Sequence, residues 1–170
     1  ATAEPLNLSS AARADTVVRP IIFVVDDDQQ LREAVRLIFE AEGHDVRTFA
    51  SAEDFLEDDG VKEEGCLLVD IHLPGMSGLD LLAALRPGGH TLPAIMITGS
   101  SDVSMVVVAM KSGALDFIEK PISRIDLLAS VGRAIALSQG ASAKRSMLDS
   151  AVRHIASLTK RQTQIMALVL

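Results

Sequence analysis

Five side chains that could take part in chemistry stand at, or directly after, the ends of short apolar runs. They are Asp26, Asp27, Asp70, Thr98 and Lys120. Carboxylates brought close together repel one another, and a hard divalent cation with oxygen ligands, such as Mg²⁺, removes that repulsion. An amine and a hydroxyl beside them suit an anionic group. The set therefore predicts a phosphoryl-transfer site in which one carboxylate can act as the nucleophile.

The apolar runs before these residues are the elements that must position them. Residues 21–25, 66–70 and 94–98 are short and almost wholly apolar, as in the central strands of a parallel sheet. Two less regular runs, around 46–49 and at 115–119, predict the remaining strands. Between the strands, apolar residues recur at helical spacing. We therefore expect five strands alternating with five helices.

Strands that alternate with helices predict an α/β fold, because parallel neighbours need crossover connections. We expect a flavodoxin-like, doubly wound (βα)5 fold with a parallel five-stranded sheet in the order 2-1-3-4-5, plus a C-terminal helical extension. In that order the ligand crevice lies between the first and third strands. Topology should therefore bring Asp26, Asp27 and Asp70 together, although they are far apart in the sequence.

Two of the helices carry more specific expectations. Residues 103–112 have apolar side chains at helical spacing, although three successive valines there also favour a strand. The expected apolar face consists of Val103, Val106, Val107 and Met110. A last helix from Ser123 is expected to end near Gln139. Its inward side chains should be Ile125, Leu128, Val131 and Ile135.

The composition bounds the class of protein. The 170 residues carry a net charge of −7, which argues against nonspecific nucleic-acid binding by this chain. The single cysteine, Cys66, cannot form an internal disulfide, and its place in a strand predicts a core residue rather than a nucleophile. No apolar run is long enough to span a bilayer. We expect a cytoplasmic protein with no membrane partner.

Four motifs follow one another along residues 20–138. They are Val25-Asp26-Asp27, Asp70-x-x-Leu73-Pro74-Gly75-Met76-Ser77-Gly78, Ile97-Thr98-Gly99 and Asp116-Phe117-Ile118-Glu119-Lys120-Pro121. Each is weak alone, but their order makes them specific together. The set resembles the receiver domain of response regulators in two-component systems, most closely the FixJ-like subgroup.

The resemblance implies a phosphoacceptor and a metal site. Asp70 resembles the phosphoacceptor. Asp27, Asp70 and the backbone carbonyl of His72 resemble direct ligands of Mg²⁺. Asp26 resembles a ligand that acts through water.

The resemblance also implies a switch. Thr98 and Lys120 resemble the contacts to the phosphoryl group. Phe117 resembles the aromatic side chain that turns inward when Thr98 moves toward that group. The family further implies a cis peptide bond between Lys120 and Pro121.

Two residues beside the acids leave alternatives open. Asp28, the third acid in a row after Asp26 and Asp27, could join the site, but its position favours the N-cap of the following helix. His72 lies two residues after Asp70, so its side chain should project at the mouth of the site. It could orient water or contact a phosphoryl oxygen, or it could be a solvated side chain over the sheet edge.

The implied function is a phosphorylation-controlled switch that a sensor histidine kinase phosphorylates at Asp70. Such a receiver catalyses its own phosphoryl transfer and slow dephosphorylation, and is not otherwise an enzyme. The alternative is a Mg²⁺-dependent phosphohydrolase with Asp70 as nucleophile. Hydrolases of that kind usually add a nearby general acid, and no carboxylate stands two residues after Asp70. A receiver-like binding module without phosphorylation is disfavoured because all the site residues are present.

Beyond the receiver the sequence predicts further segments. The expected divisions are a flexible leader 1–19, a receiver domain 20–138, a linker helix 139–158, and a truncated start of a helix-turn-helix domain, 159–170. The stretch Leu158-Thr159-x-Arg161-x-x-x-Ile165 resembles the opening of a LuxR-type helix-turn-helix domain. The full-length protein would then bind DNA through its missing C-terminal domain and control transcription. A plain C-terminal helix is the alternative.

An apolar stripe marks the tail. Leu148, Val152 and Ile155 recur at spacings of four and three, as in a short two-helix seam, and Gln139 to Ala143 resembles a hinge. Such a stripe rarely stays unpaired in a soluble protein. Residues 142–170 are therefore expected to mediate a homodimer.

Overall fold

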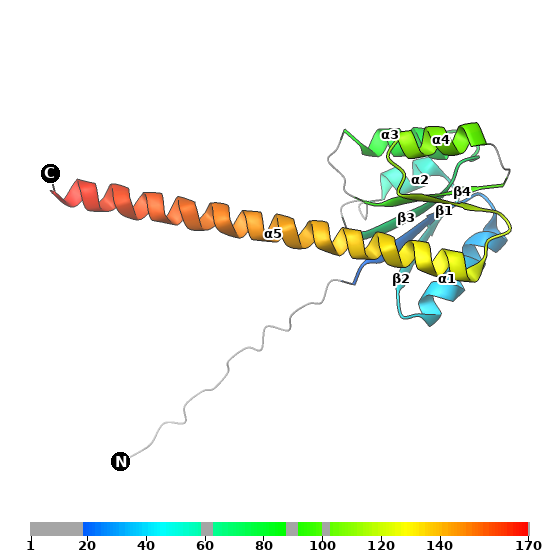
Figure 1. The fold of residues 1–170 in the computed structure, drawn as a ribbon, viewed down its shortest axis with the longest axis horizontal. Helices are drawn as coiled ribbons and strands as arrows, with labels where there is room; N and C mark the ends of the chain where they lie inside the picture. Colours follow the sequence, from blue (N-terminus) through cyan, green and yellow to red (C-terminus); the bar gives the residue numbers. More distant parts are fainter. Residues whose placement is uncertain (1–18, 59–62, 88–91, 100–102, 170) are drawn as a thin grey trace, which may run out of the picture.

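Five strands alternate with five helices along the chain (Figure 1). The computed structural model describes residues 19–58, 63–87, 92–99 and 103–169, with backbone alone at 154 and 157–169. The elements are β1 (Ile21–Val25), α1 (Gln29–Ala41), β2 (Asp45–Phe49), α2 (Ala52–Glu57), β3 (Gly65–Asp70), α3 (Gly78–Leu85), β4 (Ala94–Thr98), α4 (Val103–Lys111), β5 (Asp116–Glu119) and α5 (Arg124–Val169). The expected leader lies outside the described residues, apart from its last residue.

The sheet confirms the predicted topology. All neighbouring strands are parallel and their order is β2-β1-β3-β4-β5. Val25 at the end of β1 pairs with Val69 of β3, so the two strands end almost level. β1, β3 and β4 are buried throughout, as expected for strands covered on both faces.

Alternate strand residues divide the core into two halves, because side chains along a strand point to opposite faces. Phe23, Val25, Leu67 and Val69 pack on the face covered by α2, α3 and α4. Ile22, Val24, Cys66 and Leu68 pack on the face covered by α1 and α5 (Figure 1). The same alternation carries Asp26 and Asp70 to the α1 and α5 side as the strands end.

Side-chain caps begin several helices. The Asp28 carboxylate accepts hydrogen bonds from the backbone N–H groups of Gln30 and Leu31, which confirms its predicted N-cap role. Ser77 and Asp80 form a reciprocal capping box at the start of α3. The Asp28 cap fixes the backbone that follows Asp26 and Asp27, and the Ser77 cap ends the turn that follows Asp70.

Two predicted helix faces are wrong in part. α4 turns Met105 and Ala109 toward the core. Three members of the predicted face are exposed instead: Val103 at 74%, Val107 at 44% and Met110 at 44%. In α5, Val131 and Ile135 are buried as predicted, but Ile125 is 79% exposed, contrary to the prediction, and Leu127 is buried instead. The buried faces also include the small side chains Ala109 in α4 and Ser130 and Ala134 in α5, which a pattern of large apolar residues does not single out.

α5 is one continuous helix of 46 residues, from Arg124 to Val169. The sequence predicted a helix end near Gln139 and a hinge there, but the backbone stays helical through this segment and through Thr159. Beyond Ser142, whose hydroxyl bonds the Glu64 carboxylate, the described side chains are exposed as far as Ala156. Figure 1 shows this half of α5 projecting away from the sheet. No described helix is both long and apolar enough to cross a bilayer.

Gly78 offers a test of how tightly α3 packs on the end of β3. A Cβ atom at Gly78 would lie 2.2 Å from the backbone oxygen of Asp70. We expect Gly78→Ala to lower the free energy of unfolding by about 1–3 kcal/mol, because the backbone must shift. Urea denaturation followed by circular dichroism measures the change.

The matched control is Gly132→Ala in the exposed face of α5, where an added Cβ would meet nothing within 4 Å. This change should raise the free energy of unfolding by about 0.5–1 kcal/mol, since alanine favours the helix. Equal effects of the two substitutions would contradict the packing argument.

Candidate functional site

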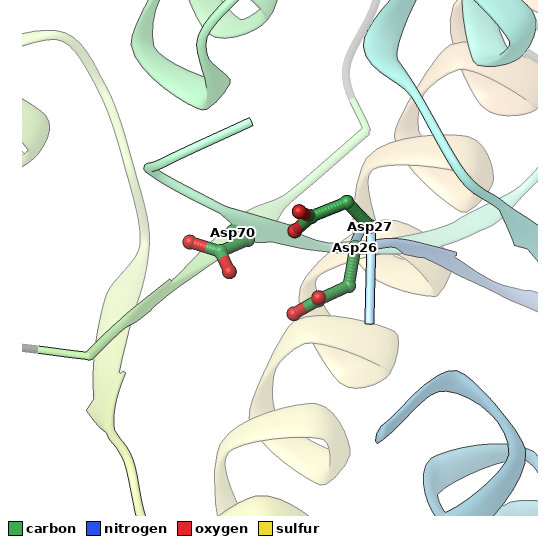
Figure 2. A group of neighbouring side chains, drawn as sticks. All are labelled: Asp26, Asp27 and Asp70. Carbon is green, nitrogen blue, oxygen red and sulfur yellow. The ribbon is translucent and has the colours of Figure 1, made fainter. Parts of the chain in front are cut away.

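Three carboxylates meet at the C-terminal edge of the sheet. Asp26 and Asp27 follow β1, and Asp70 ends β3 (Figure 2). One oxygen from each lies within 4.8 Å of the others. Asp26 is fully buried and Asp70 nearly so, whereas Asp27 is exposed. The predicted meeting of these acids across the sheet is confirmed.

Local backbone hydrogen bonds hold two of the acids in place. Asp26 Oδ1 accepts from the N–H of Asp28 at 2.8 Å, and Asp70 Oδ1 accepts from the N–H of His72 at 2.8 Å. Both are bonds to the residue two positions on, which aspartate makes readily where a strand turns into a loop. Each carboxylate therefore uses one oxygen to shape its turn and keeps the other for the site.

Lys120 connects the remaining oxygens. Its Nζ lies 2.7 Å from Asp70 Oδ2 and 3.2 Å from Asp26 Oδ2. The Lys120 backbone N–H donates to the carbonyl of Thr98 at 2.8 Å, which holds the lysine beside the end of β4. The predicted cis bond between Lys120 and Pro121 is present.

The charges around Lys120 do not balance. Burial first, and then the neighbouring Asp70 charge, raise the pKa of Asp26 above its ordinary value, although the hydrogen bond from the Asp28 N–H and, less strongly, Lys120 oppose the shift. Burial would lower the pKa of Lys120, but the hydrogen bond to Asp70 and the charge of Asp26 outweigh it, and that pKa is raised. The lysine is therefore held as a cation, one amine between two buried acids.

The donor set fits a hard divalent cation. Asp26 Oδ2 is buried and makes no hydrogen bond with the described residues, its contact to Lys120 being an ion pair. Asp27 adds an exposed carboxylate on the open side of the cluster. Mg²⁺ favours carboxylate oxygens together with water, so a partly open cluster of this kind suits it.

Thr98 and Phe117 line one hollow beside the site. The hollow, of about 250 Å³, lies between β4, β5 and α4, and its other lining residues are Val103, Val106 and Glu119. Thr98 is buried, whereas Phe117 is 41% exposed. An apolar cavity of about 150 Å³ accepts a benzene ring, so this hollow has room for the phenyl group.

Two other sequence predictions have clear structural positions. The His72 side chain is exposed, as the solvated alternative requires, and its backbone N–H holds Asp70. Cys66 is buried, and that burial raises the pKa of its thiol to about 12. The thiol therefore stays protonated, which agrees with a core residue rather than a nucleophile.

Contacts between distant segments supply residues that the sequence patterns missed. Arg32 of α1 donates to the backbone oxygen of Asp26 at 2.6 Å. Glu53 of α2 accepts from the N–H of Met76, after β3, at 2.8 Å. Neither residue belongs to a motif, and only the packed helices bring them to these loops.

This arrangement defines a class of protein. A doubly wound sheet presents buried acids, one lysine and one threonine at its C-terminal edge, as in receivers of phosphoryl groups. Residues 22–132 match the family described as "Response regulator receiver domain". The chain belongs to this family, the phosphorylated component of two-component systems.

Similar proteins carry related names. The chain is 37% identical over 150 residues to the response regulator protein TmoT of Ectopseudomonas mendocina, covering 88% of this chain and 68% of TmoT. It is 34% identical over 145 residues to the transcriptional regulatory protein FixJ of Azorhizobium caulinodans, covering 85% of this chain and 69% of FixJ. The chain therefore spans about two thirds of the length of these relatives.

Two solved structures differ in how much of the chain they match. FixJ-N superposes with a TM-score of 0.65 at 37% identity, covering 69% of this chain and 94% of its own. The response regulator StyR superposes with a TM-score of 0.79 at 36% identity, covering 89% of this chain and 76% of its own. The receiver family matches residues 22–132, which are 111 of the 170 residues, so the match to StyR extends beyond that segment.

The charge imbalance leads to a prediction for Asp26→Asn in metal-free buffer. The variant keeps the acceptor for the Asp28 N–H but removes a buried charge, leaving one acid for Lys120. We expect the free energy of unfolding to rise by about 1–3 kcal/mol at neutral pH. Chemical denaturation at several pH values measures it.

The pH dependence follows from the raised pKa of Asp26. Between its ordinary value of 3.8 and the raised value, the folded state holds a proton that the unfolded state releases, so parental stability falls as the pH rises. The advantage of the variant should be absent below pH 3.8 and complete above the raised pKa. Asp45→Asn, an exposed acid at the start of β2, is the control and should change little. A destabilised Asp26→Asn at neutral pH would refute the argument.

Proposed function

We propose that this chain is the receiver of a transcription regulator that accepts a phosphoryl group on Asp70 from a sensor histidine kinase. The observation that carries the proposal is the position of Asp70, at the end of a buried strand with Lys120 Nζ 2.7 Å from its Oδ2 oxygen. An oxygen of Asp70 would form the new bond to phosphorus as the bond from phosphorus to the kinase histidine breaks. The histidine nitrogen keeps that electron pair.

The acids would hold Mg²⁺. In the proposal, Asp27, Asp70 and the backbone carbonyl of His72 bind the cation directly, and Asp26 binds it through water. When bound, the cation would neutralise charge on the phosphoryl oxygens. The clustered oxygens and the buried Asp26 Oδ2 support this assignment.

Lys120 and Thr98 would bind the transferred group. The Lys120 ammonium would exchange part of its contact with Asp70 for a phosphoryl oxygen, and the Thr98 hydroxyl would donate to another. As Thr98 moves toward that oxygen, the hollow beside it becomes free for Phe117 to turn inward. Phe117 has no hydroxyl, so burial alone would drive its rotation, by roughly 1–3 kcal/mol.

The chain would catalyse its own phosphorylation and slow dephosphorylation. The phosphohydrolase alternative is not favoured, since the relatives are named as response regulators and transcriptional regulators. The site also agrees with this choice, because the residue two positions after Asp70 is the exposed His72 rather than a carboxylate that could act as general acid. A cytoplasmic location stays a prediction, made from the single cysteine, Cys66.

The output would be DNA binding by the part of the protein that follows this chain. The relatives are longer, and some are named as transcriptional regulators. The predicted start of a helix-turn-helix domain at 159–170 falls where side chains are not described, and its backbone continues α5. The domain boundaries therefore stay predictions.

The projecting half of α5 supports the predicted homodimer. Leu148, Val152 and Ile155 are each more than 60% exposed on one stripe of the helix. In a parallel pair of helices with these residues at the seam, Lys144 of one copy faces Asp149 of the other. Two such attractive pairs would fix the register. The occupant that fits this stripe is thus a second copy of the chain.

The phosphoacceptor assignment is tested by labelling with a small phosphoryl donor, acetyl phosphate, in Mg²⁺. The parent should be labelled and Asp70→Asn should not. Asp27→Ala should lose the Mg²⁺-dependent labelling while remaining folded, because its carboxylate is exposed.

Asp28→Asn is the matched control for labelling. It removes a neighbouring charge and keeps an N-cap acceptor, so it should label like the parent. Labelling of Asp70→Asn would refute the assignment. Release of many phosphate ions per chain from simple phosphate esters would restore the hydrolase alternative.

The homodimer is tested by sedimentation at several concentrations. Leu148→Glu combined with Val152→Glu should make the unphosphorylated protein monomeric, since the seam would bury like charges. Ser146→Glu combined with Ser150→Glu adds the same charge outside the stripe and should leave the dimer intact. A monomeric parent, or equal effects of the two pairs, would dismiss the proposed seam.

A further inference from the structure

The turn between β3 and α3 is held by a residue of a different helix. The Met76 N–H donates to Glu53 Oε1 at 2.8 Å, and Glu53 belongs to the first turn of α2. Gly75, directly before Met76, has φ of +78°. A Cβ atom at Gly75 would lie 2.6 Å from the same Glu53 oxygen. The turn and the carboxylate therefore pack closely, and a glycine makes that approach possible.

This turn carries the candidate metal-binding backbone. Residues 71–77 lie between β3 and α3 and are neither helix nor strand, so a few hydrogen bonds set their course. At the beginning, Asp70 Oδ1 accepts from the His72 N–H, and at the end Ser77 caps α3. Glu53 holds Met76, near the end of the turn, from outside. The carbonyl of His72 lies between the first of these anchors and the Glu53 contact.

The charge of Glu53 is stable in this position. The hydrogen bond from the Met76 N–H first, and its own backbone N–H second, lower the pKa of the Glu53 carboxyl. The start of a helix also favours a negative side chain. Glu53 is therefore a carboxylate at neutral pH, and a charged acceptor makes the stronger hydrogen bond to the turn.

We infer that Glu53 is a positioning residue that holds the turn after Asp70, so that the His72 carbonyl faces the acidic cluster. The inference rests on the proposed Mg²⁺ site and adds a residue from α2 to its support. Groups that orient metal ligands from outside typically change metal affinity by about 10–100-fold when removed. Because Glu53 acts through one backbone hydrogen bond, we expect the lower end of that range.

Three variants separate the hydrogen bond from the charge. Glu53→Ala removes both. Glu53→Gln removes the charge but keeps an oxygen that can accept from the Met76 N–H. Asp54→Ala removes the same charge from the same turn of α2, where the residue is exposed and its backbone N–H is bonded by Ser51.

The measurement is Mg²⁺ affinity by calorimetry, with the full chain and magnesium chloride alone, beside the unfolding midpoint and the amide spectrum by NMR. Glu53→Ala should bind Mg²⁺ about tenfold more weakly, and its Met76 amide should shift and exchange faster. Glu53→Gln should restore most of the affinity. Asp54→Ala should bind like the parent, even if it lowers the unfolding midpoint as much as Glu53→Ala does.

Each other outcome overturns a defined part of the argument. Equal losses of Mg²⁺ affinity in Glu53→Ala and Asp54→Ala would assign the effect to the charge of α2 rather than to the hydrogen bond. Equal losses of Mg²⁺ affinity in Glu53→Ala and Glu53→Gln would also assign it to charge. Parental affinity in Glu53→Ala would remove the positioning role and leave the metal site intact. A parent that binds no Mg²⁺ would overturn the metal site and the inference together.

Discussion

One ammonium group shared by two buried carboxylates is the interaction on which this site depends. Lys120 must reach it from β5, across the end of β4, because β5 is two strands away from β3. Neighbouring strands are about 4.8 Å apart, so the reach is close to 10 Å and needs a long side chain held at its base. The backbone hydrogen bond from Lys120 to Thr98 supplies that hold.

The buried acids impose a cost that the rest of the fold must offset. Asp26 is fully buried, and burial with the nearby Asp70 charge opposes its ionised form. The apolar strands β1, β3 and β4 and the helices on both faces provide the surplus stability. Buried charges are usually balanced, but here two acids, Asp26 and Asp70, share one lysine. Exceptions of this kind are expected at functional sites.

Much of this could be predicted from the sequence because the strands are buried on both faces. Their unbroken apolar runs located β1, β3 and β4, and the strand order then brought Asp26, Asp27 and Asp70 together. The rotation of the helices could not be predicted in the same way. α5 approaches the sheet through small buried side chains such as Ala134 and Ser130, and apolar periodicity overlooks these.

Bonds between distant segments were also beyond the sequence patterns. The contact from Glu53 to the Met76 N–H joins residues 23 positions apart, and no local spacing signals it. The continuity of α5 is a related case. Gly140 and its small neighbours suggested a hinge, but glycine costs a helix only about 1 kcal/mol, which the flanking turns can absorb.

Because α5 is uninterrupted, it would connect the receiver rigidly to a domain at its C-terminal end. At 1.5 Å per residue its 46 residues extend about 69 Å, of which the part beyond Ser142 makes up about 40 Å, so a tilt of about 5° where it leaves the sheet displaces its far end by about 3–4 Å. Helix length also sets direction, because each residue rotates the chain that follows it by about 100° around the helix axis. Inserting one residue after Gly140 would rotate everything downstream by that angle, whereas inserting seven would restore the facing to within about 20°. In such a chain the length of the connector, counted in residues, would determine which way the output domain faces.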